Sequence, residues 1–303
     1  MKILFEENEL EFTELKGAWL ADRNITLSVA RLDKLHPVIS GNKLFKLHYF
    51  LEDALKQPGK KLLTFGGAWS NHLAATAYAC RLTGTPAIGI VRGEESELLS
   101  LTLKQCKDDG MEIHFVSRDE YRCKDDDGFI TELKKRFGDC IIVPEGGYHP
   151  IGADGAALIM DKIKNSASTH ICTAVGTATT IAGLLKGSSV NQHIIAVPVL
   201  RGMNDIEERI SYLCGGETFN NLDVFDGYHF GGYAKKNDEL ISFMNRLFVD
   251  HGLPTDFVYT TKMMYAVIDK IKSGYFENGS RIICLHTGGL QGNLSLPVTA
   301  LQF

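Results

Sequence analysis

Two series of short apolar segments, alternating with longer amphipathic ones, restrict the possible folds of this 303-residue chain more than any other feature. In the first series, strands are predicted at 62–65, 87–91, 112–116 and 140–143, with helices between them at 71–82, 97–107 and 128–137. Short apolar strands that alternate with helices form parallel sheets with helices on their faces. The chain is therefore predicted to have an α/β fold.

The second series begins after a cluster of Gly and Pro residues between 144 and 155. Strands are predicted at 170–175, 194–199 and 282–285, and helices at 156–163, 180–186, 240–248 and 262–271. Residues 1–30 have the pattern of strand and loop, with an early strand within 20–31. The Gly and Pro cluster predicts a domain boundary.

Composition and charge exclude several classes of function. The net charge is −5, and no basic stretch is interleaved with aromatic residues, so nucleic-acid binding is not expected. Acidic residues interrupt the first nine positions, where a signal peptide needs an apolar core, and no window reaches membrane-spanning length. Neither secretion nor membrane insertion is expected.

The cysteines and histidines give no metal-binding pattern. Seven cysteines are scattered singly with no CxxC spacing, which is typical of reduced thiols in a cytoplasmic protein. The ten histidines show no HExxH or paired Cys/His spacing, so no metal site is expected. The run Asp125-Asp126-Asp127 is interpreted as a solvated loop that caps the next helix.

A lysine at the start of a helix-like run is the first candidate for chemistry. Lys43 follows Gly41-Asn42, where the backbone can turn tightly, and opens an amphipathic run to residue 54. Ser70-Asn71 then opens a second, Ala-rich helix after Gly66-Gly67. Imine chemistry needs an amine that is fixed, partly desolvated and close to groups that accept charge. Singly, Lys43 also fits a surface lysine and Ser70 an ordinary N-cap.

Two further motifs lie where strands meet helices. Residues 175–183 (Val-Gly-Thr-Ala-Thr-Thr-Ile-Ala-Gly) would present backbone N–H groups and hydroxyls at a helix N-terminus, which suits a phosphate monoester. Tyr259-Thr260 starts a helix, Thr287 follows a buried strand, and Tyr233 lies on a Gly-flanked loop. The carboxyl ends of strands are where open α/β sheets bind ligands. A single tyrosine is more often a packing residue.

Together these motifs resemble the fold-type II pyridoxal-5′-phosphate enzymes, in the branch with D-cysteine desulfhydrase and 1-aminocyclopropane-1-carboxylate (ACC) deaminase. The resemblance extends from about residue 40 to residue 289, with the motifs in the family's order. It implies a tryptophan synthase β-like fold, with the cofactor in the cleft between two α/β domains. The larger domain would comprise 1–43 and 154–303, the smaller 44–153, and the enzyme would be a homodimer.

The resemblance also implies a role for each motif residue. Lys43 would form the Schiff base, Asn71 would bond the 3′-oxygen of the cofactor, and Ser70 would contact the substrate carboxylate or act on it. Tyr233 and Tyr259 would be the two active-site tyrosines, which hold or protonate the leaving sulfur. The remaining cofactor contacts would come from Gly176, Thr177, Ala178, Thr179, Thr180, Thr260 and Thr287.

The reaction implied is β-elimination from a small amino acid, which gives pyruvate, ammonia and sulfide. ACC deaminase is the alternative within the family. Its ring opening asks for a stronger electron sink, and its members carry a glutamate where this chain has Thr260, which favours the desulfhydrase. A catalytically inactive binding protein remains open. A serine hydrolase using Ser70 is disfavoured because the glycines of a nucleophile elbow are absent.

Several positions depart from the family pattern. Trp69 stands where the family often has Gln, and Tyr148-His149 replaces a Ser-Asn pair. Phe45 stands where arginine is frequent, and the proposed phosphate loop is Gly-Thr-Ala-Thr-Thr rather than Gly-Ser-Gly-Gly-Thr. Bulky residues at 69 and 148 would reshape a substrate pocket. The identity and chirality of the substrate therefore stay open.

Overall fold

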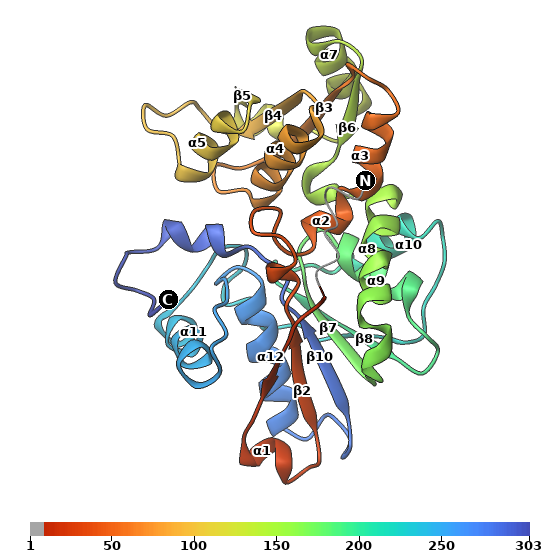
Figure 1. Ribbon diagram of the computed structural model, residues 1–303, viewed down its shortest axis with the longest axis vertical. Coiled ribbons are helices and arrows are strands. Elements are labelled where there is room, and N and C mark those ends of the chain that lie inside the picture. Colours follow the sequence, from red (N-terminus) through yellow and green to blue (C-terminus); the bar gives the residue numbers. More distant parts are fainter. Residues whose placement is uncertain (1–8) are drawn as a thin grey trace.

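The computed structural model describes residues 9–303, which form two β-sheets, each flanked by helices (Figure 1). The larger sheet has the order β1 (Phe12–Leu15), β2 (Thr26–Ala30), β10 (Arg281–Leu285), β7 (His170–Val175), β8 (His193–Pro198), β9 (Leu222–Val224). The smaller has the order β5 (Met111–Val116), β4 (Ala87–Arg92), β3 (Lys61–Gly66), β6 (Cys140–Val143). Every pairing except that of β1 with β2 is parallel, which confirms the predicted α/β fold.

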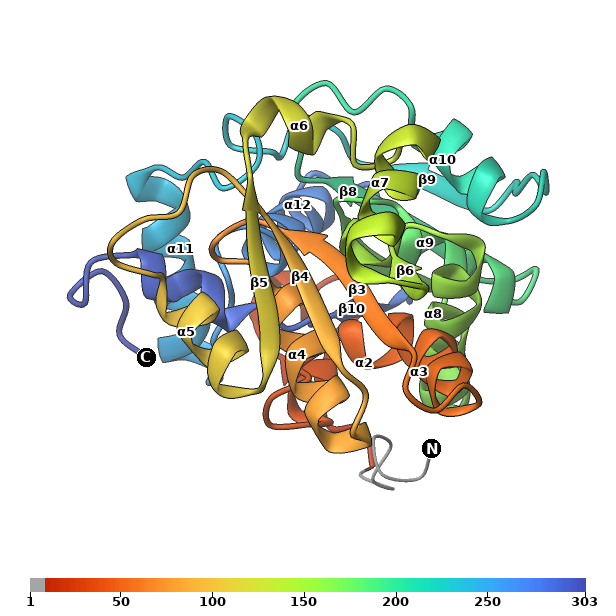
Figure 2. The same cartoon turned by 90° about the horizontal axis from the view of Figure 1, so that it is seen from above.

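Helices cover the smaller sheet in the upper part of Figure 1 and in the view from above in Figure 2. They are α2 (Lys43–Lys46), α3 (His48–Leu55), α4 (Asn71–Thr83), α5 (Leu101–Asp108), α6 (Arg118–Arg122) and α7 (Asp127–Phe137), with a 3₁₀ turn, η2 (Glu145–Gly147), after β6. The interior strands β3 and β4 are buried almost throughout. They therefore read as continuous apolar runs, as expected for a parallel sheet covered on both faces.

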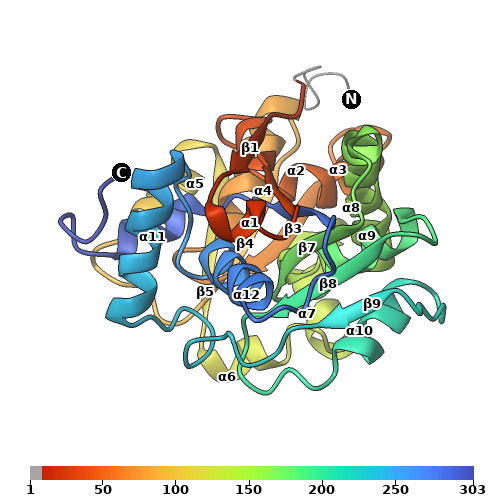
Figure 3. The same cartoon turned by 90° about the horizontal axis from the view of Figure 1, so that it is seen from below.

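The remaining elements surround the larger sheet. They are α1 (Ala18–Ala21), α8 (Pro150–Ile163), α9 (Thr179–Gly187), α10 (Ile206–Leu213), α11 (Asp238–His251) and α12 (Thr260–Lys272), with η1 (Leu32–Lys34), η3 (Lys164–Ser166) and η4 (Leu290–Ser295). Alternate residues of β7 belong to different cores: Ile171 and Val175 pack with α8 and α9, whereas Cys172 and Ala174 pack with α12 (Figure 3). This is the period-two alternation of a strand buried on both faces.

The helices α2, α8 and α9 approach one another closely because glycines occupy their contacts. A Cβ atom on Gly183 of α9 would lie 2.5 Å from the Cβ of Ala156, and one on Gly155 would lie 2.2 Å from the carbonyl oxygen of Phe45. Gly152 and Gly155, which belong to the Gly and Pro cluster that predicted a domain boundary, both lie inside α8. They serve close backbone packing rather than a turn.

Three other predicted elements differ from the structure. The early strand within 20–31 begins only at Thr26, because α1 and a turn at Asn24 (φ 52°) precede it. The helix predicted at 97–107 starts at Leu101, since the Ser100 hydroxyl accepts the N–H of Leu103 as its N-cap. The run from Lys43 is divided into two helices, α2 and α3.

The aspartate run at 125–127 precedes and begins α7. Asp126 occupies the N-cap position of this helix, but its side chain forms no capping hydrogen bond.

The predicted division into domains can be compared with the sheets. All four strands of the smaller sheet lie within 44–153, but the boundary after residue 153 falls inside α8. The division stays a prediction. The strand and loop expected at 1–8 lie outside the described residues. Within 9–303 no helix combines the length and apolar character needed to cross a bilayer.

Candidate active site

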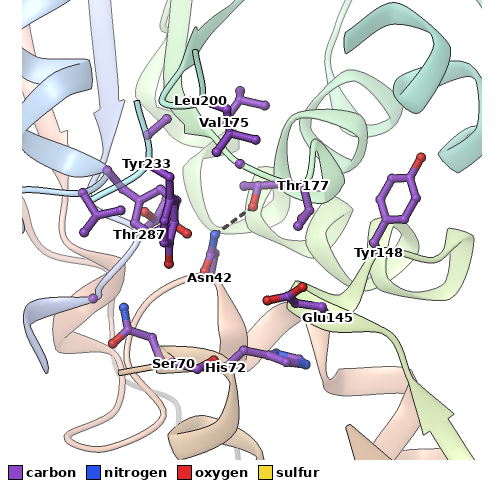
Figure 4. Close-up of a pocket in the computed structure, with 18 of the residues that line it drawn as sticks. Asn42, Ser70, His72, Glu145, Tyr148, Val175, Thr177, Leu200, Tyr233 and Thr287 are labelled. Atoms are coloured by element: carbon purple, nitrogen blue, oxygen red, sulfur yellow. Dashed lines mark hydrogen bonds between the residues drawn. The ribbon is translucent and has the colours of Figure 1, made fainter. Parts of the chain in front are cut away.

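A cavity of about 820 Å³ lies where the carboxyl ends of strands from both sheets meet. Its walls include residues that end or follow β3, β4, β6, β7, β8 and β10: Gly67, Arg92, Glu145, Gly176, Leu200 and Thr287. Figure 4 shows Asn42, Ser70, Thr177 and Tyr233 around this space. Such a position is the expected ligand site of a parallel α/β architecture.

Lys43 is the first residue of α2 and lies on the wall of the cavity. Its Nζ donates to Asn42 Oδ1 at 2.8 Å, and Asn42 Nδ2 in turn donates to Thr180 Oγ1 at 2.8 Å (dashed in Figure 4). Burial lowers the pKa of Lys43 to about 8, while the carboxylate of Asp256 acts in the opposite direction. An amine held this way carries a neutral fraction near physiological pH.

The turn before Lys43 depends on a glycine. Gly41 has φ 72°, and a Cβ atom there would lie 2.0 Å from the carbonyl oxygen of Thr287. That carbonyl accepts the N–H of Asn42 at 3.3 Å. The segment after β10 and the start of α2 are thus joined backbone to backbone, which a side chain at position 41 would prevent.

Ser70 and Asn71 lie opposite Lys43, at the N-terminus of α4. Ser70 Oγ accepts the N–H of Leu73 at 3.2 Å, so the predicted N-cap is present. The Oδ1 atom of Asn71 is buried and has no hydrogen-bond partner among the residues that the structure describes. A buried polar atom without a partner costs free energy, so this oxygen is positioned for a ligand.

The loop after β7 has the geometry of an anion site. Ala178 has φ 65° and stands at the N-cap of α9, which begins at Thr179. The hydroxyls of Thr177 and Thr179 are 3.0 Å apart and hydrogen-bonded. Gly176, Thr177, Ala178 and Thr180 line the cavity, whereas Thr179 does not. The unpaired N–H groups of the first helical turn lie at this loop, where they favour negative charge.

Two tyrosines form another part of the wall. The rings of Tyr233 and Tyr259 meet edge to face with centroids 6.1 Å apart, and both residues line the cavity. A Cβ atom on Gly176 would lie 3.2 Å from Cε1 of Tyr259, so glycine permits this ring to approach the anion loop. Burial raises the pKa of both tyrosines. Both phenols are therefore neutral at physiological pH and can donate a proton.

A buried aspartate organises the turn that contains Tyr259. The carboxylate of Asp256 accepts the backbone N–H groups of Val258, Tyr259 and Thr260 at 2.9, 2.7 and 2.9 Å. Burial raises the pKa of Asp256, and the N–H groups of Thr260 and Tyr259 oppose that shift. Thr260 is fully buried, and its side chain does not line the cavity. Its hydroxyl lies against the Asp256 carboxylate and helps to stabilise the charged form of that group.

The structure thus brings together most of the residues that the motifs singled out. Lys43, Ser70, Asn71, Gly176, Thr177, Ala178, Thr180, Tyr233, Tyr259 and Thr287 line one cavity. Thr179 and Thr260 lie behind its surface. The catalytic and binding roles assigned to these residues stay predictions.

The sequence reasoning did not single out three polar residues of the cavity wall: Lys46, His72 and Glu145. Lys46 is buried and donates to the carbonyl oxygen of Gly146 at 3.2 Å; burial, and then the charge of Lys43, lower its pKa. His72 Nε2 lies 2.8 Å from the Thr64 hydroxyl, which itself donates to a carbonyl. Burial and both lysines lower the pKa of His72. Lys46 and His72 stand inside the two motifs already recognised, which was the available signal.

No group of three His, Cys, Asp or Glu side chains within 9–303 is arranged to hold a metal ion. The cavity wall offers amines, hydroxyls and backbone N–H groups at the starts of α2, α4 and α9, and carboxylates at Asp125, Glu145, Asp205 and Glu208. The amines, hydroxyls and N–H groups bind anions and carbonyl compounds rather than cations.

Comparison with known proteins agrees with this geometry. A Thermotoga maritima protein, described provisionally as an ACC deaminase, is 32% identical over 290 residues, covering 87% of this chain and 88% of its own. A D-cysteine desulfhydrase of Klebsiella pneumoniae is 25% identical over 281 residues, and the matched region covers 86% of this chain and 86% of that protein. These are the two activities of the branch that the motifs resembled.

A solved structure and a family model complete the comparison. The crystal structure of an ACC deaminase homologue superposes with a TM-score of 0.79 at 27% identity, over 94% of this chain and 91% of that one. Residues 22–288 match the model of the family described as "Pyridoxal-phosphate dependent enzyme". The predicted fold-type II architecture and cofactor are confirmed. The chain belongs to the family of pyridoxal-phosphate-dependent enzymes.

Proposed function

We propose that this protein is a D-cysteine desulfhydrase-like lyase, which eliminates a thiolate from a small amino acid to give pyruvate, ammonia and sulfide. The observation that carries the proposal is one arrangement: Lys43, with its lowered pKa, shares a cavity with the two neutral tyrosines Tyr233 and Tyr259. A base for the α-proton and an acid for the leaving group are both needed for β-elimination.

The residues present fit pyridoxal phosphate. Asn71 lines a cavity whose wall also holds the anion loop at the start of α9, and its side-chain amide nitrogen can donate to an oxygen of the cofactor. In this proposal Lys43 holds the aldehyde carbon and Asn71 the 3′-oxygen. Residues 176–180 hold the phosphate, with Thr287 beside the ring. The resemblance assigns Thr260 to the pyridine nitrogen, although its side chain lies behind the cavity surface.

The bound cofactor supplies the electron sink that stabilises negative charge at the substrate's α-carbon. Lys43 Nζ takes the α-proton, which its lowered pKa permits because part of the amine is neutral near pH 7. Ser70, at the N-terminus of α4, is assigned to the substrate carboxylate, since its hydroxyl and the helix N-terminus both favour an anion there.

Tyr233 and Tyr259 are assigned to the leaving sulfur. Both phenols are protonated near pH 7, as tyrosines ordinarily are, so either can donate a hydrogen bond to a departing thiolate. The edge-to-face contact between the rings holds the two hydroxyl groups near the same part of the cavity.

ACC deaminase is the second candidate, favoured by the names of the Thermotoga relative and of the ACC deaminase homologue. The resemblance assigns a glutamate to the position of Thr260 in ACC deaminases. A neutral hydroxyl cannot hold a pyridinium proton by charge, so Thr260 favours elimination over ring opening. The fully buried Thr260 lies next to the turn that Asp256 caps, which leaves little room for a second carboxylate.

The test is a turnover screen with cofactor-supplemented protein. D-cysteine, L-cysteine, D-serine, β-chloro-D-alanine and ACC are offered, and pyruvate and ammonia are measured, with Lys43→Ala as the control. Release from D-cysteine together with sulfide supports the proposal. 2-Oxobutyrate and ammonia from ACC alone would assign the deaminase, and cofactor binding without any turnover would assign a non-catalytic binder.

Three further proposals rest on the resemblance. We propose that the protein is a homodimer, which light scattering after size exclusion tests. The domain boundaries at 43/44 and 153/154 are proposed with it. A cytoplasmic location is proposed because all seven cysteines are unpaired and six are buried.

A further inference from the structure

The loop that carries Tyr233 has no regular secondary structure of its own. Residues 225–237 connect β9 to α11, and φ is positive at Gly227 (89°), Phe230 (49°), Gly231 (92°), Gly232 (119°) and Ala234 (52°). Two of these five residues are not glycine, so this backbone is strained. Contacts from outside the loop must therefore hold it in place.

Lys262 of α12 provides the strongest of these contacts. Its Nζ donates to the carbonyl oxygens of His229 at 2.9 Å and of Gly232 at 2.8 Å. The side chain is fully buried. The Gly232 carbonyl forms the peptide bond with Tyr233. The Lys262 ammonium group is therefore hydrogen-bonded to the residue directly before the tyrosine.

Two neighbours on the same face of α12 support the loop as well. The ring of Phe230 meets that of Tyr265 at 5.0 Å, and the Tyr228 hydroxyl donates to Asp269 Oδ2 at 2.6 Å. Positions 262, 265 and 269 are spaced by three and four, so they form one stripe of the helix. The loop packs against this face of α12, and Lys262 is the buried residue of the stripe.

We propose that Lys262 is a positioning residue that holds Tyr233 over the cavity by binding the carbonyl oxygens of its loop. The same helix begins next to Tyr259, whose turn is capped by Asp256. One helix would thereby set both members of the tyrosine pair: Tyr259 through its own N-terminus and Tyr233 through Lys262. The consequence for turnover rests on the function proposed above, whereas the anchoring of the loop does not.

The anchoring is tested by hydrogen exchange on the cofactor-supplemented protein. Lys262→Met and Lys262→Gln remove the two charged hydrogen bonds, and Lys272→Met, at an exposed position of the same helix, is the matched control. Amides of 230–235 are expected to exchange at least about tenfold faster in both Lys262 variants and at the original rate in the control. Unchanged exchange in whichever Lys262 variant folds would overturn the inference.

The positioning role is tested by a double-mutant cycle. If Lys262 acts through Tyr233, Lys262→Gln lowers kcat about 10- to 100-fold, and adding it to Tyr233→Phe lowers kcat no further. If Lys262 had only a structural role, the two substitutions would lower kcat independently, so that their effects multiply in the double variant. Alternatively, Lys262→Gln would leave kcat unchanged although the loop amides exchange faster. Either result would contradict the positioning role. If wild-type protein turns over no substrate, the proposed function fails, and the exchange measurement alone decides whether Lys262 anchors the loop.

Discussion

The two walls of the cavity are built in different ways. One wall is formed by the starts of α2, α4 and α9, and two of these helices, α4 and α9, directly follow the strands β3 and β7. The other wall carries Tyr233 and Tyr259 and depends on buried charges: Lys262 reaches the 225–237 loop from 30 residues away, and Asp256 binds three N–H groups of one turn.

This difference separates binding from positioning. The turns of the first wall exist wherever a parallel strand runs into a helix, so they supply amide groups for an anion at little extra cost. The second wall holds charged groups that are buried, which is costly unless each is hydrogen-bonded. We expect substitutions in the first wall to act on the cofactor, and those in the second to act on stability and rate.

The largest effect is expected from Lys43→Ala in the first wall. The variant loses the amine that takes the α-proton, so kcat should fall by about 10²- to 10⁴-fold. The visible absorbance of the lysine-bound cofactor should disappear as well. Lys56→Ala, an exposed lysine at the end of α3, is the control and should keep both. Turnover in Lys43→Ala close to that of the control would exclude Lys43 as the base.

The double variant Thr177→Val/Thr180→Val tests the proposed phosphate site of the first wall. Each hydroxyl lost from the proposed phosphate site should weaken cofactor binding by about 1.5–3 kcal/mol, measured by equilibrium dialysis. Because Thr180 Oγ1 also accepts from Asn42 and Thr177 Oγ1 is hydrogen-bonded to Thr179, the two single variants are measured as well. Cofactor retention equal to wild type in the double variant would place the phosphate elsewhere.

Asp256→Asn probes the second wall. The new amide can accept fewer of the three N–H groups and brings its own donors against them, so the free energy of unfolding should fall by about 1–3 kcal/mol in urea. Asp250→Asn, at an exposed position of α11, is the control and should stay within about 0.5 kcal/mol. Equal stability of both variants would show that the carboxylate is not needed for this turn.

The smallest effect concerns pH. In the cofactor-free protein the pKa of Lys43 is lowered from 10.5 to about 8 by burial, so the unfolded chain binds more protons between these values. The Lys43 contribution to stability therefore rises as pH increases from about 8 to 10. Lys43→Met, which lacks it, should be more stable than wild type at pH 7 and lose about 1–2 kcal/mol of that advantage by pH 10. A difference between the two proteins that does not depend on pH would contradict the lowered pKa.

The residues of the first wall and the two tyrosines of the second were predicted, but the residues that support those tyrosines were not, for a physical reason. The strands at 140–143 and 170–175 were predicted to the residue, and Lys43, Ser70 and Thr177 were found because each lies beside its own turn. Turns of this kind can be recognised from the residues immediately around them in the sequence. Asp256 and Lys262 were not assigned roles, because nothing local marks a loop backbone that needs support from a separate helix.

The same limit applies to Gly152 and Gly155. A glycine in a turn and a glycine in a helix contact look alike in a sequence, and only the neighbouring backbone, that of Gly147 for Gly152 and of Phe45 for Gly155, shows which one is present. Lys46 was likewise hidden: whether the third residue after Lys43 faces the cavity depends on where the 146–147 segment returns.

Peptide mapping after borohydride reduction of the cofactor-supplemented protein identifies the lysine that holds the cofactor. Reduction fixes the cofactor to that lysine, and the cavity wall carries three lysines: Lys43, Lys46 and Lys124. We expect modification of Lys43 alone, with none in Lys43→Ala. Modification of Lys46, whose amine is also buried with a lowered pKa, or of any lysine outside the cavity would contradict this expectation.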